Sequence, residues 1–385
     1  MNNQDRLSMF LRLNNNVALK RLESPYLYHI GKDELYDIDE KAEAFLARCD
    51  GTLKRYEVES ESEFIEYCLQ EGLLESLPRP DRIRVSIDRS PVPSLRYLEL
   101  QILHRCNLKC RHCYLGPPRQ DELSLADALN ITREFVSNGG LRLLISGGEP
   151  LLYPYLKNFI KETTGLKLRR VLLTNGTLIT EENISWLNVE NIQFSLDGWR
   201  KGHDLLRGKG NFDKTIQGIH LARDAGIPIS IATMIHRGNL NEFEKISAFT
   251  KEIAATEWGI DMLCVAGSLK SNTDLIVPYK RAAHLMKYAY GGGYHGSSDG
   301  FACGRHLMTV LPTGKAVKCG FYEDSPLGDS RQGLIPCWLK LEHIPLDQLD
   351  CRGCPAVNDC AGGCRFRAST PLAPDPVMCY FYGIK

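Results

Sequence analysis

The sequence lacks an excess of charge of either sign, because 47 Lys and Arg residues balance 47 Asp and Glu residues. A protein that binds duplex nucleic acid normally carries a basic surplus, so nucleic acid is not the expected partner. No apolar run reaches the roughly 18 residues of a membrane-spanning helix, so no membrane insertion is expected. The first residues, MNNQDRLSMFLRLNNN, have no apolar core behind a basic end, which predicts a cytoplasmic rather than a secreted protein.

Internal repeats and low-complexity segments are also missing, which argues against solenoid and propeller folds. Hydrophobic residues make up 43% of the chain and charged residues 24%, the balance of a folded globular protein. A length of 385 residues is sufficient for two or three domains.

Cysteine, in contrast, is plentiful and clustered. The chain has 14 cysteines, of which three lie between positions 106 and 113 and eight lie within the last 83 residues. In a chain without an export signal, such clusters indicate metal ligands rather than disulfides. Only Cys49, Cys68 and Cys264 stand apart. They are expected to be small core residues, although Cys264, at the end of a predicted strand, can also face an active site.

Strand and helix patterns alternate over residues 95–298. Apolar stretches predict six strands, at 97–102, 142–146, 170–174, 191–196, 228–234 and 259–265. Amphipathic patterns predict helices at 124–137, 153–164, 180–188, 212–225, 240–253 and 278–290. This is the pattern of a parallel sheet covered by helices, with too few units for a complete eight-stranded barrel. We expect an α/β fold, either a partial (β/α)6 barrel or an open doubly wound sheet, with ligands at the carboxyl ends of the strands.

Smaller units flank this core. In residues 1–77, extended stretches near 17–20, 26–30 and 34–38 precede predicted helices over 40–48 and about 61–71. Four prolines within residues 78–94 indicate a linker. A Gly/Ser-rich loop at 291–300 precedes a cysteine-rich region, residues 299–385.

The first cysteine cluster follows the first barrel strand as a CxxxCxxC loop, with Cys106, Cys110 and Cys113. Three thiolates on one short loop can hold three irons of a [4Fe-4S] cube and leave the fourth iron open. The alternative is a zinc site, for which His104 or His112 would supply the fourth ligand.

Short turns close the second and fourth predicted strands. Gly147 and Gly148 leave backbone open to a close ligand, and Glu149 offers a carboxylate to an amine. Ser195 and Asp197 can bond hydroxyls such as those of a ribose. Each turn on its own is more easily explained by a structural role. Because both turns lie at the carboxyl ends of strands in one sheet, together they indicate a ligand site.

In this order, the cysteine loop, the GGEP turn and the SLDG turn resemble the radical S-adenosylmethionine (radical SAM) enzymes. The resemblance implies that the three loop cysteines hold a [4Fe-4S] cluster whose open iron binds S-adenosylmethionine (SAM). One electron then cleaves SAM, and the resulting 5′-deoxyadenosyl radical removes a hydrogen from the substrate.

The same resemblance implies the contacts to SAM. It places Gly147, Gly148 and Glu149 at the methionine amine, and Ser195 and Asp197 near the ribose. Arg207, in the stretch HDLLRGKGNF, is similar to the family arginine near the SAM carboxylate. A solvated loop charge is the alternative for Arg207.

Seven cysteines of the last region resemble the SPASM extension of radical SAM peptide-modifying enzymes. By position, the resemblance implies that auxiliary cluster I is held by Cys303, Cys319 and Cys364. It implies that auxiliary cluster II is held by Cys351, Cys354, Cys360 and Cys379, giving three [4Fe-4S] clusters in all. Cys337 lies outside the seven, and either completes cluster I or points away and leaves an open iron. A structural zinc ribbon is the alternative for the CxxC pair.

The strand and helix order of residues 1–77 is similar to the winged-helix-like PqqD domains, which recognise the leader of a ribosomally synthesised precursor peptide. Such a peptide adds as a strand to an exposed sheet edge, for which 34–38 is the candidate. The resemblance implies a peptide maturase that also needs a reductant such as flavodoxin or ferredoxin. The expected reaction is an oxidative crosslink, foremost a thioether from a Cys sulfur to a carbon.

Alternatives stay open at this point. The same machinery could form a carbon–carbon crosslink or another oxidation of the peptide. A sulfatase-maturase-like enzyme that forms formylglycine shares the last two regions but does not need residues 1–77. A non-catalytic electron-transfer protein would not need the GGEP and SLDG turns.

Overall fold

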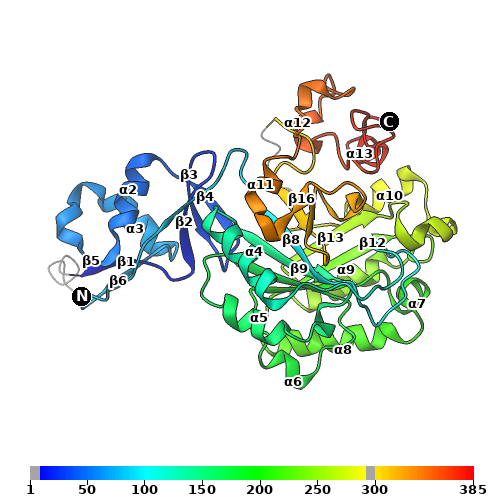
Figure 1. The fold of residues 1–385 in the computed structure, drawn as a ribbon, viewed down its shortest axis with the longest axis horizontal. Helices are drawn as coiled ribbons and strands as arrows, with labels where there is room; N and C mark the ends of the chain where they lie inside the picture. The colour runs from blue at the N-terminus through cyan, green and yellow to red at the C-terminus, as the bar shows by residue number, and fades with distance from the viewer. Residues whose placement is uncertain (1–8, 292–299) are drawn as a thin grey trace. The chain divides into compact units, whose positions relative to one another are not determined.

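The computed structural model describes residues 9–291 and 300–385, which divide into two compact units (Figure 1). The first unit comprises Met1–Arg96 together with Phe135–Leu141 and Gly165–Arg169, and the second comprises the rest of the chain. The expected boundary between 298 and 299 lies outside the described residues. Among the described helices, none has both the length and the apolar character needed to cross a membrane.

The first unit contains two small sheets and two helices. The three-stranded sheet has the order β5 (Asp50–Lys54), β1 (Phe10–Leu13), β6 (Leu74–Leu77). The four-stranded sheet has the order β4 (Glu34–Asp37), β3 (Pro25–His29), β2 (Val17–Arg21), β7 (Ile87–Arg89). The helices are α2 (Glu40–Arg48) and α3 (Ser62–Gln70). The sequence predicted the helices and β2, β3 and β4, but it did not predict β1, β5, β6 or β7.

Apolar side chains of both sheets and both helices form one core in this unit, and Cys49 and Cys68 are fully buried in it, as expected. Asp39 caps α2 by accepting the N–H of Ala42 at 2.7 Å. The structure differs from the expectation of a linker over 78–94. Part of that stretch forms β7, and the N–H of Ile83 donates to the carbonyl of Asp50 at 2.8 Å.

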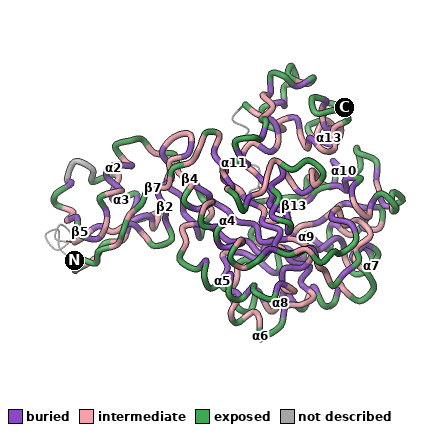
Figure 2. The backbone as a smooth tube through the Cα atoms, viewed as in Figure 1, coloured by how far each residue is buried: buried purple, intermediate pink, exposed green. Residues whose placement is uncertain are grey.

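The second unit is a nine-stranded sheet covered by helices. Its order is β13-β12-β11-β10-β9-β8-β14-β15-β16. The six strands of the core are β8 (Tyr97–Leu103), β9 (Arg142–Gly147), β10 (Arg169–Thr174), β11 (Asn191–Ser195), β12 (Ile229–Ile235) and β13 (Glu257–Met262). The pairs β8–β9, β10–β11, β11–β12 and β12–β13 are parallel. The predicted α/β fold with a partial barrel is confirmed, and Figure 2 shows the strands largely buried.

The core helices are α4 (Leu125–Ser137), α5 (Leu156–Thr163), α6 (Glu181–Ile184), α7 (Arg200–Arg207), α8 (Asn211–Asp224), α9 (Phe243–Glu252) and α10 (Tyr279–Met286). The sequence did not predict α7, and a loop position was one of the two interpretations left open for Arg207. This helix buries His203 and Leu206 and ends at Gly208, whose φ of +102° favours glycine. Arg207 is therefore the last residue of a packed helix rather than a loop residue.

The cysteine-rich region continues the core sheet. β14 (Leu307–Val310) pairs parallel with β8, and β15 (Lys315–Val317) and β16 (Gly328–Asp329) follow in antiparallel order. Its helices are α11 (Leu334–Trp338), α12 (Val357–Cys360) and α13 (Pro376–Phe381). Because α13 contacts α10, this region packs beside the end of the core (Figure 1).

Candidate active site

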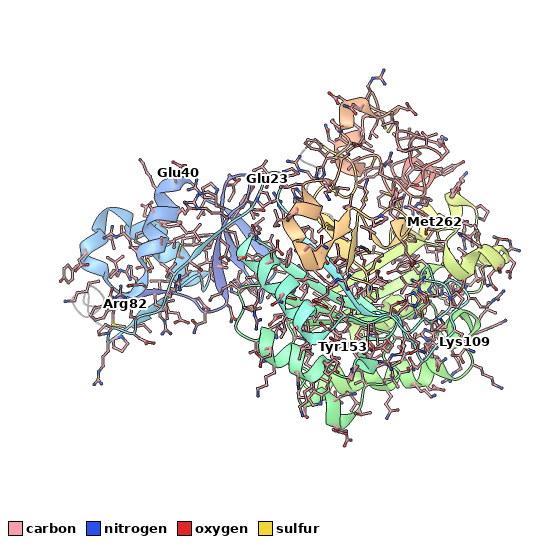
Figure 3. The ribbon with its side chains drawn as sticks, viewed as in Figure 1. Glu23, Glu40, Arg82, Lys109, Tyr153 and Met262 are labelled. Atoms are coloured by element: carbon pink, nitrogen blue, oxygen red, sulfur yellow. The ribbon has the colours of Figure 1, made fainter. Side chains whose placement is uncertain are left out.

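The cysteine loop leaves the carboxyl end of β8 and lines a cavity of about 530 Å³. Cys106, Cys110 and Cys113 all lie on the cavity wall, as does Lys109, which Figure 3 labels. None of the three thiols is in a disulfide. Burial raises the pKa of all three, to about 11 for Cys106, so each thiol keeps its proton until a metal displaces it.

Gly147 and Gly148 lie on the same wall, where β9 ends. A Cβ on Gly147 would stand 2.2 Å from the carbonyl oxygen of Leu103, and a Cβ on Gly148 would stand 2.1 Å from that of Arg105. The N–H of Gly148 donates to Leu103 at 2.8 Å, so β9 continues to pair with β8 into the start of the cysteine loop. The two glycines are thus required by the backbone packing that holds this loop.

Glu149 is fully buried and ties β9 to β10. Its carboxylate accepts the hydroxyl of Thr174 at 2.8 Å, the N–H of Asn175 at 2.9 Å and the N–H of Leu151 at 3.2 Å. Burial raises the pKa of Glu149, and these hydrogen bonds act in the opposite direction. The side chain therefore supports the cavity wall from behind, while the glycines before it reach the cavity.

Arg207 lies on the cavity wall, with its Nη1 3.9 Å from the Sγ of Cys110. Its Nε donates to the carboxylate of Asp197, which also accepts the N–H of Met234 at 2.7 Å. Asp197 is fully buried. Burial alone would raise its pKa, but the neighbouring charges, above all Arg207, outweigh burial and lower it to about 2. Asp197 thus holds Arg207 in place from behind the cavity wall. Ser195, in contrast, lies on the cavity wall itself.

His112 adds an unsatisfied group to the cavity wall. Burial lowers its pKa to about 3, so the imidazole is neutral at physiological pH. Its Nε2 lies 3.7 Å from the carboxylate of Asp197, and its buried Nδ1 has no hydrogen-bond partner among the described residues. A buried polar atom of this kind on a cavity wall is a suitable contact for a polar ligand.

Glu99, in the middle of β8, is a cavity residue that the sequence did not reveal. Its carboxylate accepts the hydroxyls of Ser146 at 2.7 Å, Thr309 at 2.8 Å and Tyr114 at 3.1 Å. The only signal in the sequence was one acidic residue inside the apolar run YLELQI. The strand pattern alone does not tell whether such a residue faces a cavity or the solvent.

The zinc alternative for the cysteine loop gains no support from the geometry. Within 9–291 and 300–385, no three Cys, His, Asp or Glu side chains are grouped for one metal ion. His104 accepts the N–H of Arg119 on its Nδ1 at 2.8 Å, and its buried Nε2 has no hydrogen-bond partner among the described residues. An iron–sulfur cube spreads its thiolates farther apart than a single ion does, so the lack of a single-ion grouping among the described residues is compatible with a cube.

The cysteines of the last region fall into two groups. One small cavity of about 20 Å³ is lined by Cys351, Cys354, Cys360 and Cys379. In the other group, burial raises the pKa of Cys303 and Cys319, and the thiol of Cys364 raises both further. None of these cysteines is in a disulfide.

Cys337 is placed apart from both groups. It lies in α11 with its Sγ against Gly328, only 2.8 Å from where a Cβ on that glycine would be. Burial raises the pKa of its thiol, and the charges that act on it most are those of Lys340, Asp329 and Glu134. The structure therefore does not bring Cys337 to the thiols of Cys303, Cys319 and Cys364.

Residues 100–250, from β8 to α9, match the sequence model of the Radical SAM superfamily. Over these residues the chain carries a radical SAM domain. The family implies SAM and a [4Fe-4S] cluster, and the cavity fits both. Its volume lies within the range of about 300–1,000 Å³ that is usual for small-molecule sites. The three thiols suit the cluster, and the charge of Arg207 suits a carboxylate.

The chain is similar to the AdoMet-dependent heme synthase of Oleidesulfovibrio alaskensis, with 28% identity over 345 residues. The match covers 75% of this chain and 88% of the heme synthase. The chain is also similar to the subtilosin biosynthesis protein AlbA of Bacillus subtilis, with 29% identity over 205 residues, covering 51% and 45%. The fold is shared with Streptococcus suis SuiB bound to its precursor peptide SuiA, at a TM-score of 0.67 and 16% identity, over 94% of this chain and 98% of SuiB.

Proposed function

We propose that this radical SAM enzyme matures a ribosomally synthesised precursor peptide by forming an oxidative crosslink, foremost a thioether from a Cys sulfur to a carbon. The observation that carries the proposal is the open strand edge of β4, in a chain that also holds a radical SAM cavity. Two similarities support it. SuiB has this fold and was determined with its precursor peptide, and AlbA is a bacteriocin biosynthesis protein.

The side chains of β4 are packed on both faces while one backbone edge stays unpaired within the described sheet. Tyr36 packs against one apolar cluster of the first unit and Leu35 against another. On its inner side β4 pairs with β3, and Ile38 donates its N–H to the carbonyl of Pro25 at 3.2 Å. Because bonded and non-bonded pairs alternate along an antiparallel ladder, the N–H groups of Leu35 and Asp37 face outward. An extended leader peptide can add there as the next strand.

In the second unit, Cys106, Cys110 and Cys113 would hold the [4Fe-4S] cluster, and Arg207 would bind the carboxylate of SAM. When bound, these groups supply the 5′-deoxyadenosyl radical that removes a hydrogen atom from the peptide. Asp197 keeps Arg207 oriented and charged from behind the wall.

The remaining wall residues would orient SAM. Gly147 and Gly148 offer backbone groups to the methionine amine. Glu149 supports this contact because it stabilises the turn that holds the two glycines. Ser195 offers a hydroxyl to the ribose, and the free Nδ1 of His112 offers a hydrogen-bonding atom to the adenine.

The two groups of tail cysteines would hold auxiliary [4Fe-4S] clusters, one per group. Thioether formation removes two hydrogens from the peptide, and these clusters complete the balance. The carbon gives up one hydrogen atom to the deoxyadenosyl radical, the sulfur gives up a proton, and the remaining electron passes to an auxiliary cluster. A reductant such as flavodoxin or ferredoxin would supply the electron that starts the reaction.

Two other activities compete with this proposal. The similarity to heme synthases over 75% of the chain supports a porphyrin substrate. A porphyrin has no peptide backbone, however, and cannot pair with the edge of β4. Formylglycine formation on a protein side chain also makes no use of that edge.

The test uses the full-length enzyme, reconstituted anaerobically, with SAM, dithionite and the peptide fraction of a native cell extract. We expect one peptide to lose two hydrogens together with one thiol that can be labelled, measured by mass spectrometry. The same mass loss with all thiols intact would indicate a carbon–carbon bond or another oxidation. Turnover of an added iron porphyrin, with no peptide changed, would contradict the proposal.

The variant Asp37→Pro tests the strand edge directly. Proline removes an outward N–H but leaves the bonds from β4 to β3 intact, and edge strands tolerate it. We expect binding of the modified peptide to weaken about tenfold or more, measured by fluorescence anisotropy, with cleavage of SAM in the absence of peptide unchanged. The matched control is Asp37→Ala, which keeps the N–H and should bind as the parent does. Equal binding by both variants would rule out the edge of β4.

A further inference from the structure

Thioether formation releases a proton from the peptide sulfur, and that proton needs an acceptor. We propose that Glu99 is the catalytic base that takes the proton from the thiol of the peptide Cys. The inference deepens the proposed function and rests on it, because only a crosslink from sulfur to carbon releases this proton. It gives a chemical task to a cavity residue that the sequence did not reveal.

Glu99 carries the only carboxylate among the described residues that line the cavity of about 530 Å³. The carboxylates of Glu149 and Asp197 are fully buried behind the wall and bonded to other groups there. Glu99 is half-buried in the middle of β8, so the sheet fixes its backbone while its side chain reaches the cavity. A base that acts on a substrate proton needs both a fixed position and access to the substrate.

The two carboxylate oxygens of Glu99 are hydrogen-bonded unequally. Oε1 accepts the hydroxyl of Ser146 at 2.7 Å, the hydroxyl of Tyr114 at 3.1 Å and the amide of Gln101 at 3.2 Å. Among the described residues, Oε2 accepts only the hydroxyl of Thr309, at 2.8 Å. Each carboxylate oxygen has about two lone-pair sites, so Oε2 keeps one for a proton while the bonds to Oε1 fix the group.

Glu99 lies where the cysteine loop meets the segment that follows Cys319. Its partner Tyr114 directly follows the last thiol of the loop, and the ring centroids of Tyr114 and Phe321 are 5.1 Å apart. A Cβ on Gly320 would stand 2.7 Å from Cε2 of Tyr114, so the two segments are in close contact. A peptide sulfur beside Glu99 would therefore be near both the loop assigned to the radical and the segment assigned to the electron acceptor.

The other titratable side chains of the cavity wall are less suited to this step. Nδ1 of His104 already accepts a backbone N–H, so its Nε2 carries the hydrogen and has no free lone pair. His112 faces the carboxylate of Asp197, which follows β11, and β9 and β10 separate that strand from β8. Lys109 is a cation and has no acceptor site. Glu99 is thus the wall residue with an acceptor atom available on this side of the cavity.

The step balances with groups that the proposed function already names. The S–H proton passes to Oε2 of Glu99, the carbon gives a hydrogen atom to the deoxyadenosyl radical, and the S–C bond forms as one electron leaves for an auxiliary cluster. Cys and Glu side chains ordinarily have pKa values of about 8.5 and 4.3, so the thiolate is a minor species. Bond formation with loss of the electron consumes the thiolate, so a small population is sufficient.

The test uses the full-length enzyme, reconstituted anaerobically, and the peptide that the cell-extract experiment identifies, synthesised either with its Cys or with selenocysteine in that position. Glu99→Gln keeps the size of the side chain but cannot accept the proton. The matched control is Glu122→Gln, which removes a carboxylate that pairs with Arg105 and does not line the cavity. Crosslinked peptide and 5′-deoxyadenosine are measured by mass spectrometry, together with iron content and the thermal unfolding midpoint.

We expect Glu99→Gln to keep its irons and to form 5′-deoxyadenosine at the parent rate, but to crosslink the Cys peptide about 100-fold more slowly. A selenol is ionised at neutral pH without a base, so Glu99→Gln should crosslink the selenocysteine peptide as the parent does. Glu122→Gln should match the parent with both peptides. Crosslinking of the Cys peptide by Glu99→Gln at the parent rate would overturn the assignment. A loss that selenocysteine does not restore would also overturn it, because the role of Glu99 would then be structural.

Two outcomes with the parent enzyme separate this step from the proposed function. A crosslinked product with every thiol intact would overturn the assignment of Glu99, because no proton would leave a sulfur. A parent that modifies no peptide would contradict the proposed function itself, and the assignment would fall with it.

Discussion

Asp197 and Glu149 are buried carboxylates that shape the cavity without opening into it. Asp197 neutralises Arg207 beside the cysteine loop, and Glu149 joins the ends of β9 and β10. Breaking a buried ion pair costs more than the pair contributes, because the remaining charge is left without a partner. These two residues should therefore affect SAM binding as strongly as residues that touch SAM.

The substitution Asp197→Asn keeps the shape of the side chain but removes the charge that Arg207 needs. We expect the unfolding free energy of the apo protein to fall by about 3 kcal/mol. We also expect SAM to bind about tenfold more weakly, as measured by chemical denaturation and equilibrium dialysis, because Arg207 loses its orientation. The control Asp213→Asn breaks the exposed pair with Arg200 and should change neither quantity. Unchanged SAM binding by Asp197→Asn would show that Arg207 does not act on SAM.

The substitution Gly148→Ala places a methyl group where the carbonyl of Arg105 stands. The start of the cysteine loop must move, which we expect to cost at least about 3 kcal/mol. Iron content should drop from about twelve to about eight per chain, because only the cluster at this loop is lost. In the control Gly259→Ala, the nearest atom to the new methyl group is 3.9 Å away, so full iron content is expected. Full iron content in Gly148→Ala would contradict the role of this packing.

Residue spacing singled out the cysteine loop, because its three thiols are encoded within eight residues. It did not predict the role of Glu99. Glu99 gathers hydroxyls from β9, β14 and the cysteine loop. These contacts depend on segments distant in sequence, for which a single chain contains no periodic signal.

Among the elements, the six core strands β8–β13 were predicted to within a few residues because each is a continuous apolar run between amphipathic helices. The helix α7 was not, since its first residues, Arg200, Lys201 and Gly202, are polar or flexible. The strand β14 was also unpredicted, although it extends the core sheet beside β8. Both elements carry cavity groups: Arg207 is on α7, and Thr309 on β14 bonds Glu99.

Glu99 should therefore connect elements as well as line the cavity. We expect Glu99→Ala to lower the unfolding free energy by about 2–3 kcal/mol, because three hydroxyls lose a charged acceptor. The smaller change Thr309→Val removes only the bond from β14 and should cost about 1 kcal/mol. Chemical denaturation of both variants measures this. Equal losses in the two would show that Ser146 and Tyr114 gain nothing from the carboxylate.

Over the whole molecule, the proposal assigns peptide recognition to the first unit and radical chemistry to the second. If so, the two activities should separate. With Cys106, Cys110 and Cys113 all replaced by Ala, we expect the precursor peptide to bind within twofold of the parent affinity, measured by fluorescence anisotropy, while crosslinking stops. Loss of binding in this variant would place recognition at the cavity instead.

Lys20 of β2 is fully buried, and its ammonium group donates to Asp88 at 2.8 Å and to the carbonyls of Gly140 at 3.1 Å and Lys167 at 3.0 Å. Two of these acceptors, Gly140 and Lys167, belong to the first unit but are translated long after its last strand, β7. Domains usually fold in the order of their synthesis, yet here the earliest strands must wait for residues up to 169 before their buried amine is satisfied. A shortened gene product ending near residue 77 would expose that amine, and exchanging this unit between related enzymes would require exchanging the later segments with it.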